Sequence, residues 1–301
     1  MPGPTVALAL SLAVAGILAT GLSTGLGAPL NVVATTSILG DVVQQVGGER
    51  IELTLLLPPG TDPHTFDPSA REGRAVADAD VVFMVGSGLE AEARLAGFLA
   101  GARGPVVAVA ADGAPQDPRA AADPHVWLDP TQVGAWAERI AATLAKLSPD
   151  YAQEFHARAA AYADQLADLD EWIRGQVAEL PPERRILIVD HLAFGYFAAR
   201  YGFRQRAIVE GFSTLAEPSA RELAAVEAAI RELSVPAVFA TYGSSPVLPQ
   251  RVAQDTGVQL VWLYAGTLSD PAGPAPTYLE MMRWNVSAVV AALDDQGEGS
   301  E

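Results

Sequence analysis

Two histidines of this chain stand in nearly the same short sequence. His64 lies in residues 61–68 (TDPHTFDP) and His125 in residues 123–130 (DPHVWLDP), although the chain has only four histidines. Proline fixes its own φ and pushes the preceding residue toward an extended conformation, so each ring is presented from a stiff loop. A carboxylate on either side suits a metal ligand, because a ligating histidine usually donates its second ring N–H to a carboxylate, carbonyl or water.

The two other histidines stand in different surroundings. His191 ends the apolar run 186–191 (ILIVDH) and is a third candidate ligand. His156 stands inside a long helical pattern beside Glu154 and Arg158, which is typical of a solvated or packed helix residue rather than a ligand. The alternative interpretation of the two Asp-Pro-His tripeptides is that they form capped turns that carry surface histidines.

The composition limits the kind of partner that this protein has. The 301 residues are 50% hydrophobic and carry a net charge of −17, and this length predicts two lobes rather than one core. An acidic chain is not expected to bind nucleic acid or anionic lipid, because both require a basic surface. Cysteine is absent, so a transition-metal site must use imidazole and carboxylate, and no lipid-modified cysteine is expected.

Residues 1–28 resemble a secretory leader. Residues 6–19 are apolar, and Gly27 and Ala28 precede Pro29. This pattern predicts an exported protein, periplasmic or on the cell surface, with cleavage near Ala28. No Lys or Arg precedes the apolar run, so an uncleaved N-terminal anchor is the competing interpretation, although the run is short and glycine-interrupted for a membrane span.

Short apolar segments alternate with helical patterns along the rest of the chain. The expected strands cover residues 30–35, 51–57, 80–85, 106–110, 186–189, 207–209, 237–240 and 259–264. Such alternation indicates parallel sheets covered by helices on both faces. Between the two groups of strands, apolar residues recur at threes and fours from residue 149 to residue 180, which predicts a helix roughly 48 Å long.

The predicted fold is therefore α/β, with two βα lobes joined by one long rigid helix. The N-terminal lobe is expected over residues 29–147, the linking backbone helix over 148–181 and the C-terminal lobe over 182–301. Ligands of parallel sheets bind outside the carboxyl ends of the strands. Because His64 and His191 follow strands of different lobes, we expect a metal site in the cleft between the lobes.

Four ordered blocks resemble the metal-binding solute receptors of bacterial zinc and manganese ABC importers. The blocks are 58–68 (PPGTDPHTFDP), 123–130 (DPHVWLDP), 190–197 (DHLAFGYF) and 273–282 (GPAPTYLEMM). The resemblance implies a monomeric extracytoplasmic receptor that captures a divalent transition metal between two lobes and delivers it to a membrane ABC permease. Residue by residue, His64, His125 and His191 match three ligands of the family.

One departure from the family concerns the fourth ligand. Many members place an aspartate after the last strand, where this chain reads 263–270 (LYAGTLSD), so Gly266 takes that position. Glycine offers no side-chain ligand, which leaves water, Asp270 or Glu210 as candidates. A set of imidazoles favours Zn²⁺ over Mn²⁺, because carboxylate-rich sites of higher coordination suit manganese better.

Two other functions share part of this pattern. Three histidines with an open fourth position are also typical of catalytic zinc, so a hydrolase or hydratase is one alternative. The chain contains no H-E-x-x-H pair, however, and no carboxylate dyad stands out. A metal-binding adhesin with the same fold is the other alternative, and we expect a transport receptor rather than an enzyme.

Overall fold

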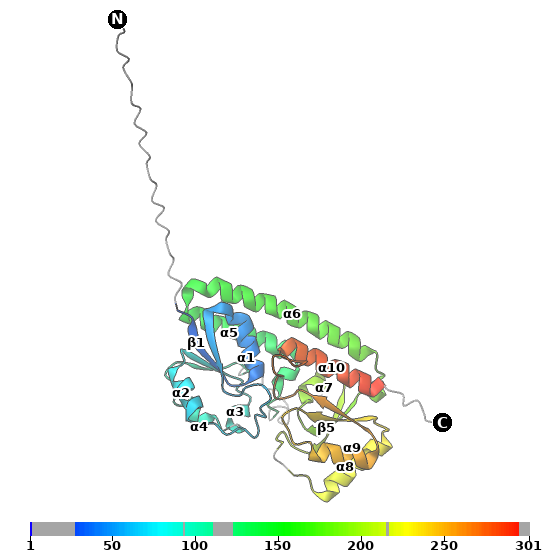
Figure 1. Cartoon of the computed structure of the whole chain (residues 1–301). Coiled ribbons are helices and arrows are strands. Elements are labelled where there is room, and N and C mark those ends of the chain that lie inside the picture. Colours follow the sequence, from blue (N-terminus) through cyan, green and yellow to red (C-terminus); the bar gives the residue numbers. More distant parts are fainter. Residues whose placement is uncertain (2–27, 93, 111–122, 215–216, 295–301) are drawn as a thin grey trace.

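The computed structural model describes Met1 and residues 28–92, 94–110, 123–214 and 217–294. Residues 2–27 of the expected leader lie outside the described part of the chain. The described residues form two lobes, each built on a four-stranded parallel sheet, and one long helix runs along both lobes (Figure 1). Within the described residues, no helix is both long enough and apolar enough to span a membrane.

The sheet of the N-terminal lobe has the strand order β2-β1-β3-β4, and all of its pairings are parallel. Its strands are β1 (Leu30–Ala34), β2 (Ile51–Leu55), β3 (Val81–Met84) and β4 (Val106–Ala108). Its helices and turns are α1 (Ser37–Gly47), η1 (Gly48–Arg50), α2 (Ala70–Asp78), α3 (Leu89–Glu92), α4 (Ala96–Leu99), η3 (Val126–Leu128) and α5 (Pro130–Leu147). The two four-residue helices α3 and α4 were not predicted, because one turn is too short to show a periodic pattern.

The C-terminal sheet repeats this layout with the order β6-β5-β7-β8. Its strands are β5 (Ile186–His191), β6 (Arg204–Val209), β7 (Ala237–Thr241) and β8 (Gln259–Leu263). Its helices and turns are η5 (Pro182–Arg184), α7 (Gly195–Tyr201), α8 (Ala220–Glu232), α9 (Val247–Thr256) and α10 (Tyr278–Asp294). Strand β5 continues two residues beyond the predicted end, because His191 pairs with Val209 of β6.

Local side-chain chemistry sets where several helices begin. Ser69 and Glu72 form a capping box at α2, and Ser219 and Glu222 form the same box at α8. The carboxylate of Asp129 accepts the backbone N–H of Thr131 at the start of α5, where Pro130 occupies the first turn. These side chains satisfy N–H groups that the first helical turn leaves without partners.

The long helix predicted over residues 149–180 is present as the turn η4 (Pro149–Tyr151) followed by α6 (Ala152–Ala178). Helix α6 has 27 residues, which corresponds to roughly 40 Å. Its buried side chains are those of the predicted apolar face: Phe155, Ala159, Tyr162, Leu166, Leu169, Ile173 and Val177. Helix α6 lies along α1 and α5 of the N-terminal lobe and contacts α10 of the other lobe (Figure 1).

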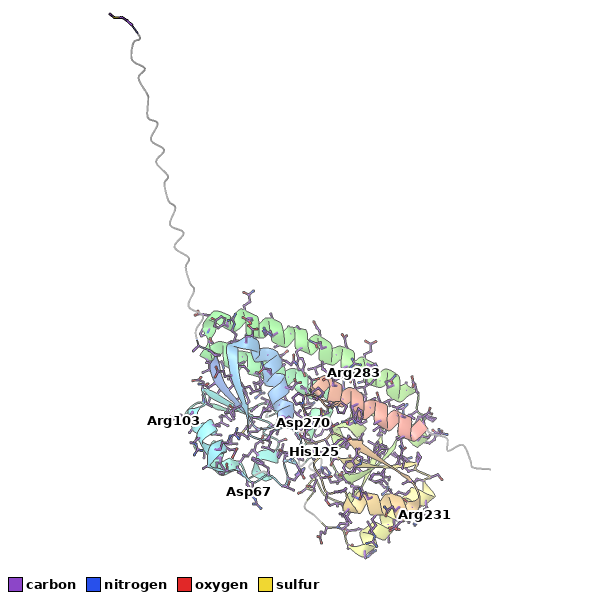
Figure 2. All side chains as sticks on the ribbon, in the orientation of Figure 1. Asp67, Arg103, His125, Arg231, Asp270 and Arg283 are labelled. Carbon is purple, nitrogen blue, oxygen red and sulfur yellow. The ribbon has the colours of Figure 1, made fainter. Side chains whose placement is uncertain are left out.

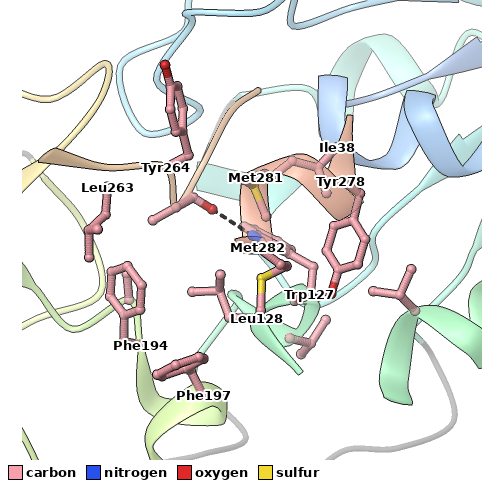
Figure 3. Close-up of a cluster of buried hydrophobic side chains, with 14 of the residues drawn as sticks. Ile38, Trp127, Leu128, Phe194, Phe197, Leu263, Tyr264, Tyr278, Met281 and Met282 are labelled. Atoms are coloured by element: carbon pink, nitrogen blue, oxygen red, sulfur yellow. Dashed lines mark hydrogen bonds between the residues drawn. The ribbon is translucent and has the colours of Figure 1, made fainter. Parts of the chain in front are cut away.

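The two lobes share one apolar core. A continuous cluster of buried side chains extends from Val32 in β1 to Ile188 in β5, and Figure 3 shows aromatic and methionine side chains from both lobes packed together. Helix α10 joins the lobes directly, because Tyr278 donates its backbone N–H to Asp41 of α1 at 2.9 Å and its hydroxyl to the carbonyl of Trp127 at 2.7 Å. Close-packed cores deform little, so the lobes are not free to rotate widely.

The carboxylate of Asp170 connects α6 to the C-terminal lobe. It accepts hydrogen bonds from Nε and Nη2 of Arg200, both at 2.7 Å, and from the Tyr201 hydroxyl at 2.8 Å. Nε of Arg174, on the same helix, is 3.1 Å away. Burial by itself would raise the pKa of Asp170, but the hydrogen bonds outweigh burial and lower the pKa from 3.8 to about 2.

We predict that Asp170→Asn lowers the free energy of unfolding by about 1–3 kcal/mol at pH 7, because charged donors lose a charged acceptor. The folded-state pKa is depressed, so this contribution is complete above the unfolded pKa of about 4 and fades as the pH falls toward 2. Urea unfolding at pH 7 and pH 3 measures the effect. Asp168→Asn, at an exposed position of the same helix, is the control, and an equal loss in both variants would contradict the prediction.

Candidate metal centre

The loop that carries His64 follows β2 and is shaped by Asp62. The Oδ1 atom of Asp62 accepts the backbone N–H of His64 at 2.9 Å, and its carbonyl accepts the N–H of Thr65 at 3.3 Å. An aspartate side chain that binds the backbone two residues further on is a local turn motif, and the residue between them, Pro63, has a fixed φ. The sequence Asp-Pro-His therefore fixes the direction in which this histidine leaves the chain.

His125 is held by the same motif, with one further contact. The Oδ1 atom of Asp123 lies 2.9 Å from the backbone N of His125 and 2.8 Å from its ring Nδ1. The hydroxyl of Ser87 donates to the carbonyl of Pro124 at 2.7 Å and fixes the loop from its other side. The ring of His125 is consequently locked in both position and orientation.

His191 is the last residue of β5 and has an equivalent carboxylate. Oδ1 of Asp190 lies 2.8 Å from both the backbone N and the ring Nδ1 of His191. Oδ2 of Asp190 accepts from the backbone N–H of Thr241 at 2.9 Å, from its hydroxyl at 2.7 Å and from the hydroxyl of Ser244 at 2.8 Å. Asp190 thus ties His191 to the loop after β7.

The three rings meet at the junction of the lobes. The ring centroids are 5.6 Å apart for His64 and His125, 5.5 Å for His64 and His191, and 5.3 Å for His125 and His191. One nitrogen from each ring lies within 4.8 Å of the other two, and the residues are only 4%, 0% and 3% exposed. Three imidazoles on one tetrahedral zinc ion would have centroids about 5.2 Å apart, so the arrangement fits a shared ion.

Hydrogen bonding assigns the ring atoms that face this shared space. In His125 and His191, Nδ1 points at a carboxylate oxygen, so Nδ1 carries the proton and Nε2 keeps its lone pair. Nε2 of His125 is buried and has no hydrogen-bond partner within the described part of the chain. An unsatisfied buried acceptor is costly, and binding of a cation would satisfy it.

The pKa of His125 lies well below 6.5. Burial is the main cause, and the neighbouring rings of His191 and His64 lower the pKa further. The ring is therefore neutral at physiological pH, which is the state that a metal requires.

The two carboxylates that orient the rings differ in acidity. Burial raises the pKa of Asp123 to about 7, although the backbone N–H of His125 acts in the opposite direction. Burial also opposes ionisation of Asp190, but its hydrogen bonds from His191 and Thr241 outweigh burial and lower its pKa to about 2. Asp190 is consequently ionised at all physiological pH values, whereas Asp123 titrates within that range.

Trp127 closes one side of the cluster. Its ring is 5.4 Å from the ring of His125 in an edge arrangement, and the residue is 1% exposed. Its Nε1–H donates to the carbonyl of Ala265 at 2.6 Å, the contact drawn as a dashed line in Figure 3. The next residue, Gly266, lies so close to Pro63 that a Cβ would be 2.9 Å from the proline Cδ.

The other candidate residues lie elsewhere. Glu210 and Asp270 are exposed, and among the described residues the group with metal-ligand spacing contains the three histidines and neither carboxylate. His156 is exposed on α6, as expected. Figure 2 shows His125 in the middle of the molecule where the lobes meet, whereas Asp67, Arg103 and Arg231 lie toward the outside.

Sequence reasoning anticipated carboxylates beside the histidines but did not identify the contacts from the opposite side of the junction. The aspartate before each ring could have been singled out, because it precedes the histidine by one or two positions in all three cases. The roles of Thr241, Ser244 and Ala265 had no sequence signal, because each contact joins residues more than 50 positions apart.

The fold and the site together define a solute receptor for metal ions. It has two βα lobes with parallel sheets, helix α6 shared by both lobes, and three buried imidazoles at their junction. The sequence profile of the family described as "ZnuA: Zinc-uptake complex component A periplasmic" matches residues 32–292, and the chain belongs to this family. The chain is therefore a substrate-binding component of a metal ABC importer and not an enzyme.

Relatives support this assignment over most of the chain. The manganese-binding lipoprotein MntA of Halalkalibacterium halodurans is 34% identical over 269 residues, which cover 89% of each protein. The zinc-binding protein TroA of Treponema pallidum is 33% identical over 282 residues, again 89% of each. A solved structure of TroA superimposes with a TM-score of 0.82 at 30% identity and covers 89% of this chain and 99% of that one.

We predict that Asp123→Asn weakens the binding of a divalent metal by about 10–100-fold, because the ring of His125 loses the carboxylate that orients it. Titration calorimetry of chelator-stripped protein measures the affinity. Asp67→Asn is the matched control, since Asp67 follows His64 in the related motif but is exposed and paired with Arg94. Unchanged affinity in the Asp123 variant would show that this carboxylate does not support the site.

Proposed function

We propose that this protein captures Zn²⁺ outside the cytoplasm with His64, His125 and His191 and delivers it to an ABC permease. The observation that supports this most directly is the convergence of three buried histidines at the junction of the two lobes, each with a neighbouring aspartate that accepts its backbone N–H. Neutral imidazole is a preferred zinc ligand, and zinc accepts four ligands in tetrahedral geometry.

The choice of zinc over manganese rests on the chemistry of the donor set. Three nitrogen atoms converge, and no carboxylate of the described residues joins them at ligand distance. Pro63 packs against Gly266, where many family members have an aspartate ligand, so a side chain at that position would displace the loop of His64. A water molecule completes the four-coordinate site in this proposal, and such a nitrogen-rich site of low coordination number suits zinc better than manganese.

The relatives leave the metal open, because MntA is described as manganese-binding and TroA as zinc-binding. The donor set is therefore the basis of the choice. Binding exchanges the hydration waters of the ion for imidazoles that already lie at nearly the required spacing. Because the lobes share an apolar core and helix α6, we expect local adjustment of the histidine loops rather than a wide hinge movement.

We place the protein outside the cytoplasm as a monomer, with the permease as its partner and without a nucleic-acid ligand. The support comes from the leader-like residues 1–28 and from relatives described as a lipoprotein and as periplasmic. None of the 301 residues is a cysteine to which a lipid could be attached. After export, the leader would either be cleaved near Ala28 or be retained as an N-terminal anchor.

His125→Ala is expected to weaken zinc binding by at least about 100-fold, because it removes one of three protein ligands. His156→Ala should leave the affinity unchanged, since His156 is exposed on α6. Competition with a chromophoric zinc chelator at pH 7 measures both variants. Equal effects of the two changes would overturn the ligand assignment.

Wild-type protein should bind Zn²⁺ more tightly than Mn²⁺, because nitrogen donors in a tetrahedral arrangement discriminate against manganese. Titration calorimetry of metal-free protein with each ion at equal ionic strength measures the difference. Affinity for zinc should fall as the pH drops, since protons compete for imidazole. Tighter binding of manganese would refute the proposed metal and leave the receptor function in place.

A further inference from the structure

A small cavity in the C-terminal lobe is lined by His191, one of the three histidines. Its volume is about 50 Å³, which is room for a few water molecules. Its wall includes Asp190, His191, Thr214, Ser244, Ser245 and Leu248. Ser245 is exposed whereas His191 is buried, so the cavity extends from the protein surface to one ring of the cluster.

The wall of this cavity is chemically suited to a cation. Three residues of its wall, Thr214, Ser244 and Ser245, carry hydroxyl groups. Hydroxyl oxygens can replace hydration waters around an ion that moves through a narrow passage. Asp190 adds a negative charge at the inner end, where it binds both His191 and Ser244.

The cluster is closed on the side of Trp127. His125 is completely buried there, and the hydrogen bond from Trp127 to the carbonyl of Ala265 covers it. Gly266 and Pro63 lie in contact beside this bond. An ion on that side would have to separate packed elements of both lobes, whereas the cavity already reaches His191.

One hydrogen bond crosses between the lobes next to the cavity. The hydroxyl of Thr214 donates to Oδ2 of Asp62 at 2.7 Å, while Oδ1 of the same carboxylate holds the backbone N–H of His64 at 2.9 Å. Gly243 packs against Asp62 as well, since a Cβ there would be 3.3 Å from the aspartate N. The backbone N–H of Gly60 also binds the C-terminal lobe, at Thr267 and Leu268, so the loop of His64 is held at both ends and the Thr214–Asp62 bond is the contact on the side of the cavity.

We propose that the metal ion enters and leaves through this cavity, that His191 is the first imidazole it meets, and that the Thr214–Asp62 hydrogen bond must open for it to pass. This inference rests on the proposed function, because it concerns the path of the same ion to the same histidines. It predicts that residues of the passage change the rates of binding more than the affinity.

Ser245→Trp tests the passage by placing a bulky ring at its mouth. Association and dissociation of Zn²⁺, followed by stopped-flow competition with a chromophoric chelator, should both slow by about tenfold while Kd stays unchanged. Val247→Trp is the matched control, because Val247 is 65% exposed in the same segment and does not belong to the described lining of the cavity. Wild-type rates in the Ser245 variant, or equal slowing in the control, would overturn the proposal.

Thr214→Val tests the hydrogen bond, because valine keeps the shape of threonine and removes the donor. Both rates should rise by about tenfold, the change expected when one hydrogen bond to a charged group is lost, and Thr214→Ser should restore wild-type rates. Faster dissociation alone, with weaker binding, would mean that Thr214 supports the bound state and would overturn the gating role. Failure of wild-type protein to bind zinc would instead refute the proposed function, so the two failures are distinguishable.

Discussion

The hydrogen bond between a buried aspartate and the histidine that follows it is the interaction on which the metal centre depends. In all three cases one carboxylate oxygen accepts the backbone N–H of the histidine, and for His125 and His191 it also faces ring Nδ1. Burying a carboxylate is unfavourable unless hydrogen bonds compensate it. In His125 and His191 the same hydrogen bonds also leave Nε2 on the side of the ring that faces away from the carboxylate. One set of contacts therefore both compensates the burial of the carboxylates and orients the two rings.

The scaffold around the centre resists large movement. A single apolar core extends through both lobes, and α6, together with α10, contacts elements on either side of the junction. The contacts directly around the rings are different in kind, because they are individual hydrogen bonds from loops, such as Thr214 to Asp62 and Trp127 to Ala265. Local opening of such loops costs less than separating a packed core, which favours access to a buried ion through loops rather than through parting of the lobes.

The packing around position 266 bears on the donor set of the proposed metal site. Glycine at position 266 allows the loop after β8 to lie against Pro63, immediately before His64. A side chain at position 266 would meet the ring of Pro63, and the carboxylates of Asp270 and Glu210 are exposed. Among the described residues, the group with metal-ligand spacing consists of nitrogen donors, and the carboxylates of Asp123 and Asp190 contact the outer ring nitrogens of His125 and His191.

Much of this protein was determined by the sequence itself, because the signals are local. Alternating apolar segments predicted two parallel sheets, a repeat of threes and fours predicted α6, and the Asp-Pro-His turns and the end of β5 singled out His64, His125 and His191. The positions of Glu210 and Asp270, the Trp127–Ala265 bond and the cavity beside His191 were decided only by the tertiary structure. These features depend on how loops that are far apart in the sequence pack against one another at the junction of the two lobes. A short-range pattern of residues does not specify such long-range contacts.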